Sequence, residues 1–238
     1  MSNDAFEFKK FIIKQNKCAM KVGTDAVLLG SWVTTDNCQR ILDIGTGTGV
    51  IALMLAQKTT AAITALEIDE ATYEQAKENV SESTFHRQIK VVHQSFQEFW
   101  KQNKEKYDLI ISNPPFFIDS LKSTDAPRST ARHADVLPFA DLIEGAKELL
   151  LAQGKFCLIL PKKEAEYFKK LAEQKGFYLT KLLRVRPSHD KEEDKRHIMQ
   201  FELHDNSYSE ETLYIRTADP QEYSPEYKLL TKDYYMGF

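Results

Sequence analysis

The sequence contains few cysteines and no long apolar run. Its three cysteines, Cys18, Cys38 and Cys157, lie far apart and lack the spacing of metal ligands, so we expect free, reduced thiols and no metal site. No run approaches the roughly 20 apolar residues that cross a bilayer. The polar start MSNDAFEFKK also lacks the apolar core of a signal peptide. These absences predict a cytoplasmic protein that makes no membrane contact.

The chain also lacks a basic excess. Its formal net charge is −3, whereas a protein dedicated to binding nucleic acid usually carries a surplus of lysine and arginine. The charge is unevenly distributed, however, because residues 1–21 hold five lysines against two acidic residues. This segment is therefore a candidate for contacting a polyanion. Its lysines are Lys9, Lys10, Lys14, Lys17 and Lys21.

What the sequence does contain is a regular alternation of short apolar runs with longer amphipathic segments. The runs RILDI, AITALEI, IKVVHQ and YDLIIS have the length and composition of buried strands. The segments between them, such as VIALMLAQK and DEATYEQAKENV, are typical of helices. This order predicts an α/β fold with a mostly parallel sheet.

The second half of the chain continues the same pattern. A helix, a strand and another helix are predicted in FADLIEGAKELLLAQ, GKFCLILP and KKEAEYFKKLAEQKG. After Gly176, two strand-like runs flank the charged turn SHDKEEDK and predict an antiparallel hairpin at the sheet edge. No linker interrupts the series, and a chain of this length can bury one sizeable core. We predict a single domain over residues 1–238, with a short basic extension (1–20), a core (21–203) and a C-terminal elaboration (204–238).

A glycine-rich turn follows the first predicted core strand. The segment LDIGTGTGV places Asp43 at the strand end and Gly45, Gly47 and Gly49 before a helix. Glycines suit a sharp turn that a ligand approaches closely, and the helix start offers unpaired N–H groups. A dinucleotide site would show G-x-G-x-x-G, whereas these glycines repeat at every second residue. Glu67 ends the next strand, 24 residues after Asp43, where a carboxylate can accept hydrogen bonds from the hydroxyls of a ribose.

Together these residues resemble the D-x-G-x-G-x-G signature of S-adenosylmethionine-dependent methyltransferases of the Rossmann-like class. The resemblance implies S-adenosylmethionine as the cofactor. It also implies a mostly parallel sheet of seven strands with the antiparallel hairpin at one edge. The cofactor contacts that it assigns are Asp43, Gly45, Thr46, Gly47, Gly49 and Glu67.

The segment LIISNPPFF places a second motif at the end of a strand. Asn113, Pro114, Pro115 and Phe116 match the N-P-P-[YF] motif of enzymes that methylate planar amides or exocyclic amines. In such a loop the Asn113 side-chain carbonyl and the Pro114 backbone carbonyl can accept hydrogen bonds from one NH2 group, while the prolines stiffen the backbone and add no N–H. Phe116 can stack on a flat substrate. We assign catalysis to these four residues and a cofactor contact to Asn113; a strand-ending turn is the structural alternative.

Further segments narrow the resemblance. MKVGTDAVLLGSW, ARH and the tail YSPEYKLLTKDYYMGF are similar to the bacterial methyltransferases that modify adenine 37 of a valine tRNA at its 6-amino group. This similarity extends from about Phe8 to the C-terminus. In that family the segment from Lys21 to Asp25 lies over the cofactor pocket, which implies a lid that contains Gly23, Thr24 and Asp25. Thr24 or Asp25 is also suited to N-cap the helix that follows.

One segment departs from the family pattern. After the third strand, the family often places an aspartate that accepts a hydrogen bond from the adenine amine of the cofactor. This chain has Ser95 and Phe96 there. We therefore expect the adenine contact from backbone groups, from the Ser95 hydroxyl or from packing against Phe96.

The loop after NPPFF carries basic residues on the side of the sheet where a substrate would enter. As a group they suit a phosphate clamp, and as ordinary loop charges they would have no role. With the N-terminal lysines, they form the set that we consider for RNA contact. The set is Lys14, Lys17, Lys21, Arg128, Arg132 and His133.

The sequence thus predicts an enzyme that transfers a methyl group from S-adenosylmethionine to the 6-amino group of adenine in tRNA. The family resemblance implies position 37 of tRNA(Val), and a monomer is the favoured oligomeric state. A protein glutamine N5-methyltransferase would hold a side-chain amide in the same loop, but the N-terminal helical domain of those enzymes is missing. A DNA adenine methyltransferase would need an added recognition domain. A cofactor-binding module without catalysis is the remaining alternative, and the intact NPPF motif argues against it.

Overall fold

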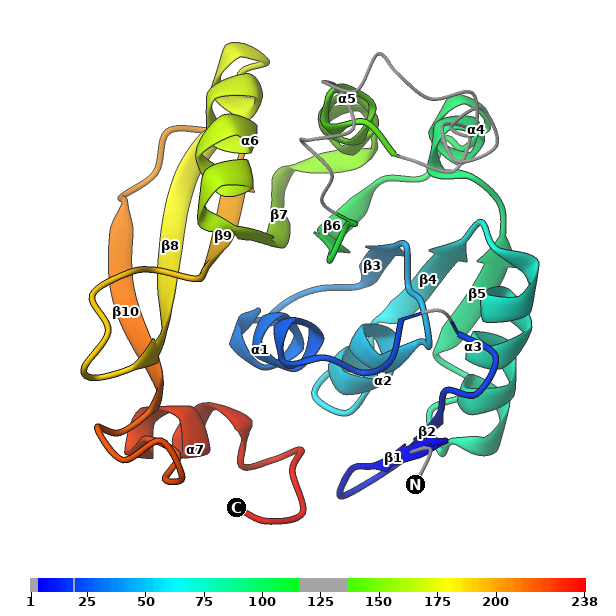
Figure 1. Cartoon of the computed structure of the whole chain (residues 1–238). Helices are drawn as coiled ribbons and strands as arrows, with labels where there is room; N and C mark the ends of the chain where they lie inside the picture. The colour runs from blue at the N-terminus through cyan, green and yellow to red at the C-terminus, as the bar shows by residue number, and fades with distance from the viewer. Residues whose placement is uncertain (1–3, 19, 116–136) are drawn as a thin grey trace, which may run out of the picture.

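A computed structural model describes the chain at residues 4–18, 20–115 and 137–238 (Figure 1). None of the helices in these ranges combines the length and the apolar character that a membrane crossing requires. Four of the predicted site residues lie outside the described residues: Phe116, Arg128, Arg132 and His133.

Eight strands form the main sheet in the order β10-β8-β9-β7-β6-β3-β4-β5. The strands from β7 to β5 in this order run parallel, β9 runs antiparallel to both of its neighbours, and β10 runs parallel to β8. The short apolar runs of the sequence form the parallel strands, because helices cover both faces of such a sheet and leave no polar side. The strand bounds are β3 Arg40–Ile44, β4 Ala62–Glu67, β5 Ile89–His93, β6 Tyr107–Ser112, β7 Leu150–Pro161, β8 Tyr178–Ser188, β9 Arg196–Glu202 and β10 Ser209–Arg216.

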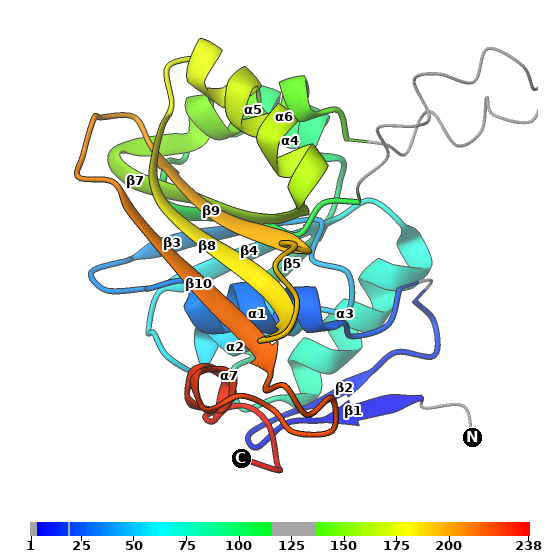
Figure 2. The same ribbon diagram turned by 60° about the vertical axis from the view of Figure 1, so that its left-hand side comes forward.

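Helices lie on both faces of this sheet (Figures 1 and 2). One face is covered by α1 (Thr24–Trp32), α2 (Val50–Ala56) and α3 (Glu70–Glu82). The other face is covered by α4 (Phe96–Gln102), α5 (Phe139–Leu149) and α6 (Lys162–Gln174). A last helix, α7 (Pro225–Thr231), follows β10 and packs against it and against α1. The predicted α/β class with a mostly parallel sheet is therefore confirmed.

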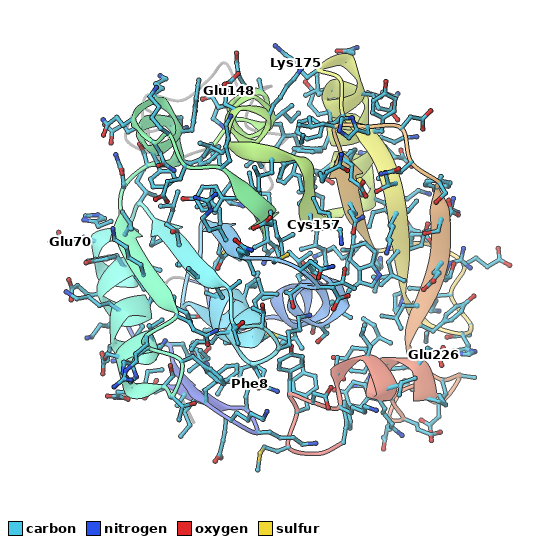
Figure 3. All side chains as sticks on the ribbon, turned by 180° about the vertical axis from the view of Figure 1, so that it is seen from behind. Phe8, Glu70, Glu148, Cys157, Lys175 and Glu226 are labelled. Carbon is cyan, nitrogen blue, oxygen red and sulfur yellow. The ribbon has the colours of Figure 1, made fainter. Side chains whose placement is uncertain are left out.

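The strands feed two hydrophobic cores because successive side chains of a strand point to opposite faces. Ile41 and Cys157 belong to the core under α1 and α2, whereas Leu42 and Phe156 belong to the core under α5 and α6. Figure 3 shows Cys157 among the side chains in the middle of the molecule. Burial raises the pKa of this thiol to about 12, so it remains protonated and unreactive at neutral pH.

The prediction of seven strands with the hairpin at the edge needs a correction. Strands β8 and β9 form the predicted hairpin, but β10 pairs with β8 and takes the edge. Residues 204–238 therefore contribute a strand to the sheet that the core residues form. The sequence hides this strand because Leu213 is its one buried residue, as is common for an edge strand. We propose that residues 1–238 fold as one domain.

The N-terminal segment folds back onto the domain. Its strands β1 (Ala5–Glu7) and β2 (Ile12–Lys14) pair antiparallel and lie near the C-terminal end of the chain (Figure 1). Lys9 Nζ donates hydrogen bonds to the backbone carbonyl oxygens of Lys232 and Phe238, at 2.6 and 2.5 Å. The described part of the basic extension is thus held against the C-terminal end of the chain.

Candidate functional site

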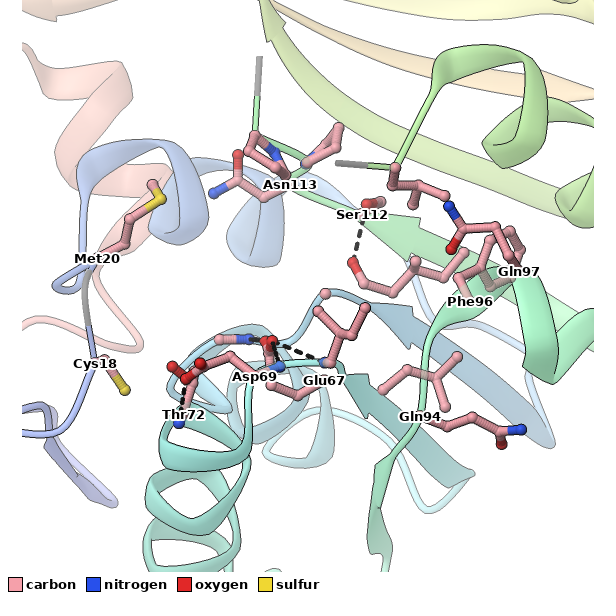
Figure 4. A pocket seen from close by; sticks show the side chains of 18 residues that line it. Cys18, Met20, Glu67, Asp69, Thr72, Gln94, Phe96, Gln97, Ser112 and Asn113 are labelled. Atoms are coloured by element: carbon pink, nitrogen blue, oxygen red, sulfur yellow. Dashed lines mark hydrogen bonds between the residues drawn. The ribbon is translucent and has the colours of Figure 1, made fainter. Parts of the chain in front are cut away.

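A cavity of about 300 Å³ opens at the carboxyl ends of the central strands (Figure 4). Its walls come from the ends of β3, β4 and β6, the start of α3 and the start of α4. Cys18 and Met20, from the N-terminal segment, form the wall opposite α4. The position matches the rule that ligands of open α/β sheets bind beyond the carboxyl ends of the strands.

The glycine-rich turn between β3 and α2 borders this cavity. The φ angles of Gly45, Gly47 and Gly49 are +69°, +59° and +83°, a region in which other residues would be strained. Gly45 and Gly47 line the cavity, and a Cβ at either position would meet no atom within 4 Å. Gly49 instead faces α3, where a Cβ would lie 3.7 Å from Ala76. The first two glycines leave space for a ligand, whereas at Gly49 it is the positive φ, and not a lack of space, that requires glycine.

Asp43 lies fully buried behind the turn. Its Oδ2 accepts a hydrogen bond from Thr46 Oγ1 at 2.5 Å, whereas its Oδ1 has no hydrogen-bond partner among the described residues. Burial raises the pKa of this carboxyl to about 7, and the nearby Glu67 charge adds to the increase. Asp43 and Thr46 do not line the cavity, so the structure places both one layer behind it.

Glu67, the last residue of β4, lies in the cavity wall (Figure 4). Its Oε2 accepts from Gly47 N at 2.9 Å, while its Oε1 accepts from the backbone N–H groups of Ile68 and Asp69 at 2.9 and 3.0 Å. A carboxylate offers about four lone-pair sites, so three backbone bonds leave room for little more than one further donor. Glu67 therefore shapes the glycine-rich turn and still presents a carboxylate edge to the cavity.

Asn113, Pro114 and Pro115 line the opposite side of the cavity from the start of α3 (Figure 4). They follow β6 directly, and the hydroxyl of the preceding Ser112 donates to the backbone oxygen of Ile44 at 2.9 Å. This buried bond joins the end of β6 to the end of β3. The NPP segment and the glycine-rich turn, about 65 residues apart in the sequence, are therefore brought to one cavity.

Of the two residues after β5 that we expect to contact the adenine of the cofactor, only one lines the cavity. Ser95 caps α4, and its hydroxyl accepts a hydrogen bond from Glu98 N at 3.2 Å. Ser95 does not line the cavity, whereas Phe96 does. Gln94 and Gln97, on either side of this pair, also line it. Neither amide belongs to a motif in the sequence, although the position of both next to Ser95 and Phe96 is a signal that could have indicated them.

The residues of the predicted lid lie at the start of α1. The N-cap of this helix is Gly23 and carries no side-chain cap, so the expected capping by Thr24 or Asp25 is wrong. Asp25 Oδ2 instead accepts from Arg196 Nε at 2.7 Å, which ties α1 to the start of β9. None of Gly23, Thr24 and Asp25 lines the cavity. Their role as a lid remains a prediction.

The N-terminal lysines considered for RNA contact make ion pairs with α3. Lys14 Nζ lies 2.9 Å from Glu78 Oε1 and 2.6 Å from Glu82 Oε1, and Lys17 Nζ lies 3.0 Å from Glu78 Oε2. All of these side chains are at least partly exposed, so water screens each pair and it contributes little to the stability of the fold. Lys21 is exposed.

Other cavity residues gave little signal in the sequence. Ile68, Asp69 and Thr72 follow Glu67 closely and could have been found from its position. Cys18 and Met20 come from a segment without a motif, and only the fold brings them to the cavity. Among the described residues, no cluster of three His, Cys, Asp or Glu side chains could hold a metal ion.

Comparison with known proteins adds a family and a fold. The family model described as methyltransferase small domain matches residues 18–180. A protein of Parabacteroides distasonis named tRNA1(Val) (adenine(37)-N6)-methyltransferase is 42% identical over 236 residues and spans 99% of both chains. A protein of Bacteroides thetaiotaomicron with the same name is 45% identical over 240 residues, again over 99% of both chains.

Solved structures share the fold at low sequence identity. A predicted O-methyltransferase of Agrobacterium tumefaciens superposes with a TM-score of 0.71 at 18% identity, over 88% of this chain and 96% of that one. A ribosomal protein L11 methylase of Lactobacillus delbrueckii subsp. bulgaricus gives 0.57 at 14% identity, over 83% and 84% of the two chains. These two structures support the fold alone.

Proposed function

Because the chain belongs to the methyltransferase small domain family and its full-length relatives share one name, we propose that it methylates tRNA. The methyl group passes from S-adenosylmethionine to the 6-amino group of adenine 37 in tRNA(Val). One observation carries this proposal: the NPP segment, the glycine-rich turn and Glu67 line the same cavity. A methyl donor and a planar amine therefore have adjacent sites.

The cavity fits the cofactor on four structural grounds. Gly45 and Gly47 leave open space against the backbone, and Glu67 presents a carboxylate that can accept from a ribose hydroxyl. One layer behind the cavity lining, Asp43 Oδ1 has no hydrogen-bond partner among the described residues, and its carboxylate charge suits an ammonium group bound in the cavity. Phe96 and Ile68 add apolar surface, which suits the adenine ring. When bound, S-adenosylmethionine supplies a methyl group already activated by its sulfonium.

The chain's own contribution to the reaction is to orient the amine and exclude water. The Asn113 side-chain carbonyl and the Pro114 backbone carbonyl accept hydrogen bonds from the adenine amine and so direct its nitrogen lone pair into the cavity. Pro114 and Pro115 add no competing N–H donor. The hydrogen bond from the Ser112 hydroxyl to the backbone oxygen of Ile44 fixes the end of β6 against the end of β3, and so fixes the point at which the NPP segment leaves the sheet. Positioning and desolvation then account for most of the acceleration, and no separate base is needed.

Nucleoside mass spectrometry of cellular tRNA tests the proposed function. Cells that lack the protein should lose N6-methyladenosine from tRNA(Val). Overproduction of the protein in these cells should restore the modification. Unchanged tRNA would contradict the proposal. Parallel assays on a release-factor glutamine and on duplex DNA test the alternatives, because methylation of either one would assign the NPP segment to another substrate.

The buried Asp43 makes cofactor binding depend on pH. Its pKa of about 7 in the free protein means that half of the carboxyls are protonated at that pH. A cofactor ammonium near Oδ1 favours the carboxylate, so binding should be strongest above pH 7 and should weaken as the pH falls below it. The expected loss is up to about tenfold in affinity per pH unit.

Calorimetry between pH 5.5 and 7 measures this dependence, because an α-ammonium group keeps its proton in this range. Asp43→Asn keeps the size of the side chain but cannot titrate, so its affinity should be lower and should not change across this range. A wild-type profile as flat as that of Asp43→Asn would refute the ammonium contact.

We also propose that the N-terminal segment contacts RNA. Removal of residues 1–17 should raise the KM for tRNA far more than the KM for the cofactor, and tRNA binding should weaken with salt. The truncation also removes the backbone of Lys14, to which the buried Asn79 is hydrogen bonded at 2.9 Å in both directions. A double variant, Lys14→Gln with Lys17→Gln, removes the charges and keeps that backbone. If this double variant lowers the Tm without changing the KM for tRNA, the two lysines only stabilise the packing against α3 and do not contact RNA.

A further inference from the structure

One helix face beside the cavity has no role in the site described so far. Helix α6 begins directly where β7 ends, at Pro161. Strand β7 pairs with β6, with Leu158 next to Ser112. Since Asn113 follows Ser112, the first turn of α6 lies at the same edge of the sheet as the NPP segment.

This first turn carries two exposed lysines, Lys162 and Lys163. The positive end of the helix dipole disfavours cations there, so they bring no local stabilisation. Neither forms an ion pair within the described residues, although Glu164 and Glu166 are close in sequence. Within the described residues, both cations are therefore available to an anionic partner outside the chain.

An exposed aromatic ring continues this face. Tyr167 is 46% exposed, and it lies four residues after Lys163 and three before Lys170, which places all three on one side of the helix. Lys170 is also exposed and unpaired within the described residues. Lys169, one position earlier, instead pairs with Glu173 at 3.6 Å. The face therefore carries a ring between two cations, and the exposed Glu166, three residues after Lys163 and four before Lys170, lies beside them.

Packing connects this face to the cavity. The Tyr167 ring contacts Phe139 with centroids 6.3 Å apart, and Phe139 opens α5. Leu137, two residues before Phe139, lines the cavity. Helices α5 and α6 lie side by side on one face of the sheet (Figures 1 and 2). A polymer that enters the cavity can therefore extend over Phe139 onto Tyr167.

We propose that the α6 face, defined as Lys163, Tyr167 and Lys170, binds the RNA strand next to the target adenine. The lysines contact phosphates, and the tyrosine ring stacks on an unpaired base. Basic grooves with aromatic rings are the usual surface for single-stranded RNA, whereas lysine is depleted in protein interfaces. This inference rests on the proposed function, because the RNA must reach the cavity.

A double variant, Lys163→Gln with Lys170→Gln, tests the phosphate contacts. We expect its KM and its Kd for tRNA to rise about tenfold and the slope of log Kd against log salt to fall by about two. The kcat at saturating tRNA and the affinity for S-adenosylmethionine should not change. Lys169→Gln is the matched control, because it removes one paired lysine from the same helix and should behave as the wild type.

A second pair of variants tests the ring. Tyr167→Ala should weaken tRNA binding by about tenfold, whereas Tyr167→Phe keeps the π-face and should bind as the wild type. Equal tRNA affinities for Tyr167→Ala and Tyr167→Phe, or a double lysine variant equal to Lys169→Gln, would overturn the assignment.

Binding measured without turnover separates this inference from the proposed function. If the wild type binds tRNA but methylates none, the proposed function fails, while the Kd values of the variants still decide the role of the α6 face. If the wild type methylates tRNA and the variants bind it normally, the α6 face alone is refuted. If the wild type binds no RNA, both are wrong.

Discussion

Asn113→Ala should lower kcat for tRNA methylation by about two to three orders of magnitude while the affinity for S-adenosylmethionine is largely kept. The carboxamide oxygen is needed most as the amine approaches the methyl group, so its loss affects the transition state more than the ground state. Asn113 lies in the cavity wall and is partly exposed, and Ser112 and Pro114 hold the backbone on either side. The substitution should therefore cost little stability.

Single-turnover kinetics, cofactor calorimetry and thermal melting on the same preparations check this result. If Asn113 only ends a strand, Asn113→Ala would melt at a lower temperature and keep its activity per folded molecule. That outcome would mean that the NPP segment is a turn and not part of an active site.

Two substitutions of Phe116, which follows the NPP segment in the sequence, test whether its ring stacks on the substrate. Phe116→Tyr keeps the π-face and should retain activity. Phe116→Ala loses stacking of about 1–3 kcal/mol per base and should raise the KM for RNA. If both variants act alike, stacking by this residue is not part of binding.

Glu67→Ala should weaken S-adenosylmethionine binding by about 1–3 kcal/mol, the loss of a charge-assisted hydrogen bond to the ribose. The same change deprives the N–H groups of Gly47, Ile68 and Asp69 of their acceptor. The Tm should therefore fall as well, because the glycine-rich turn loses the hydrogen bond from Gly47 N to the Glu67 carboxylate. Glu67→Gln should be nearly as harmful, since its NH2 group would face backbone donors.

Calorimetry and melting curves separate the two effects. Glu70→Ala is the matched control, because it removes an exposed carboxylate three residues away and should leave the cofactor affinity unchanged. A Glu67→Ala protein that melts earlier but binds the cofactor normally would limit Glu67 to a structural role and exclude the ribose contact.

The sequence predicts the central sheet and the position of the site because strong local signals specify both. Buried parallel strands require continuous apolar runs, and the glycine-rich turn requires positive φ at Gly45, Gly47 and Gly49. The carboxyl ends of adjacent parallel strands necessarily lie together. For this reason the strand ends that carry the NPP segment and Glu67 lie around one cavity.

Side-chain direction could not be predicted in the same way. Ser95 occupies the position of the family's adenine-binding aspartate but caps α4, because its hydroxyl lies within reach of Glu98 N. Thr24 and Asp25 are good capping residues, yet the helix starts one residue earlier and Asp25 pairs with Arg196. In both cases a local hydrogen bond decides the direction, and its partner is not evident from the sequence pattern.

Contributions from distant segments were equally hidden. Cys18 and Met20 reach the cavity because the N-terminal strands pack against α3, where the buried Asn79 binds the backbone of Lys14. Strand β10 joins the sheet with a single buried residue and thus has almost no apolar pattern. Tertiary contacts create both features, and no short-range signal encodes them.

The most direct test of the proposed function is to incubate the purified protein with unmodified tRNA(Val) and methyl-labelled S-adenosylmethionine and then to map the label. We expect one methyl group per tRNA, present as N6-methyladenosine at position 37, and no label when adenine 37 is replaced by guanine. Label at another nucleotide, or no label on tRNA under conditions in which the cofactor binds, would contradict the proposed function.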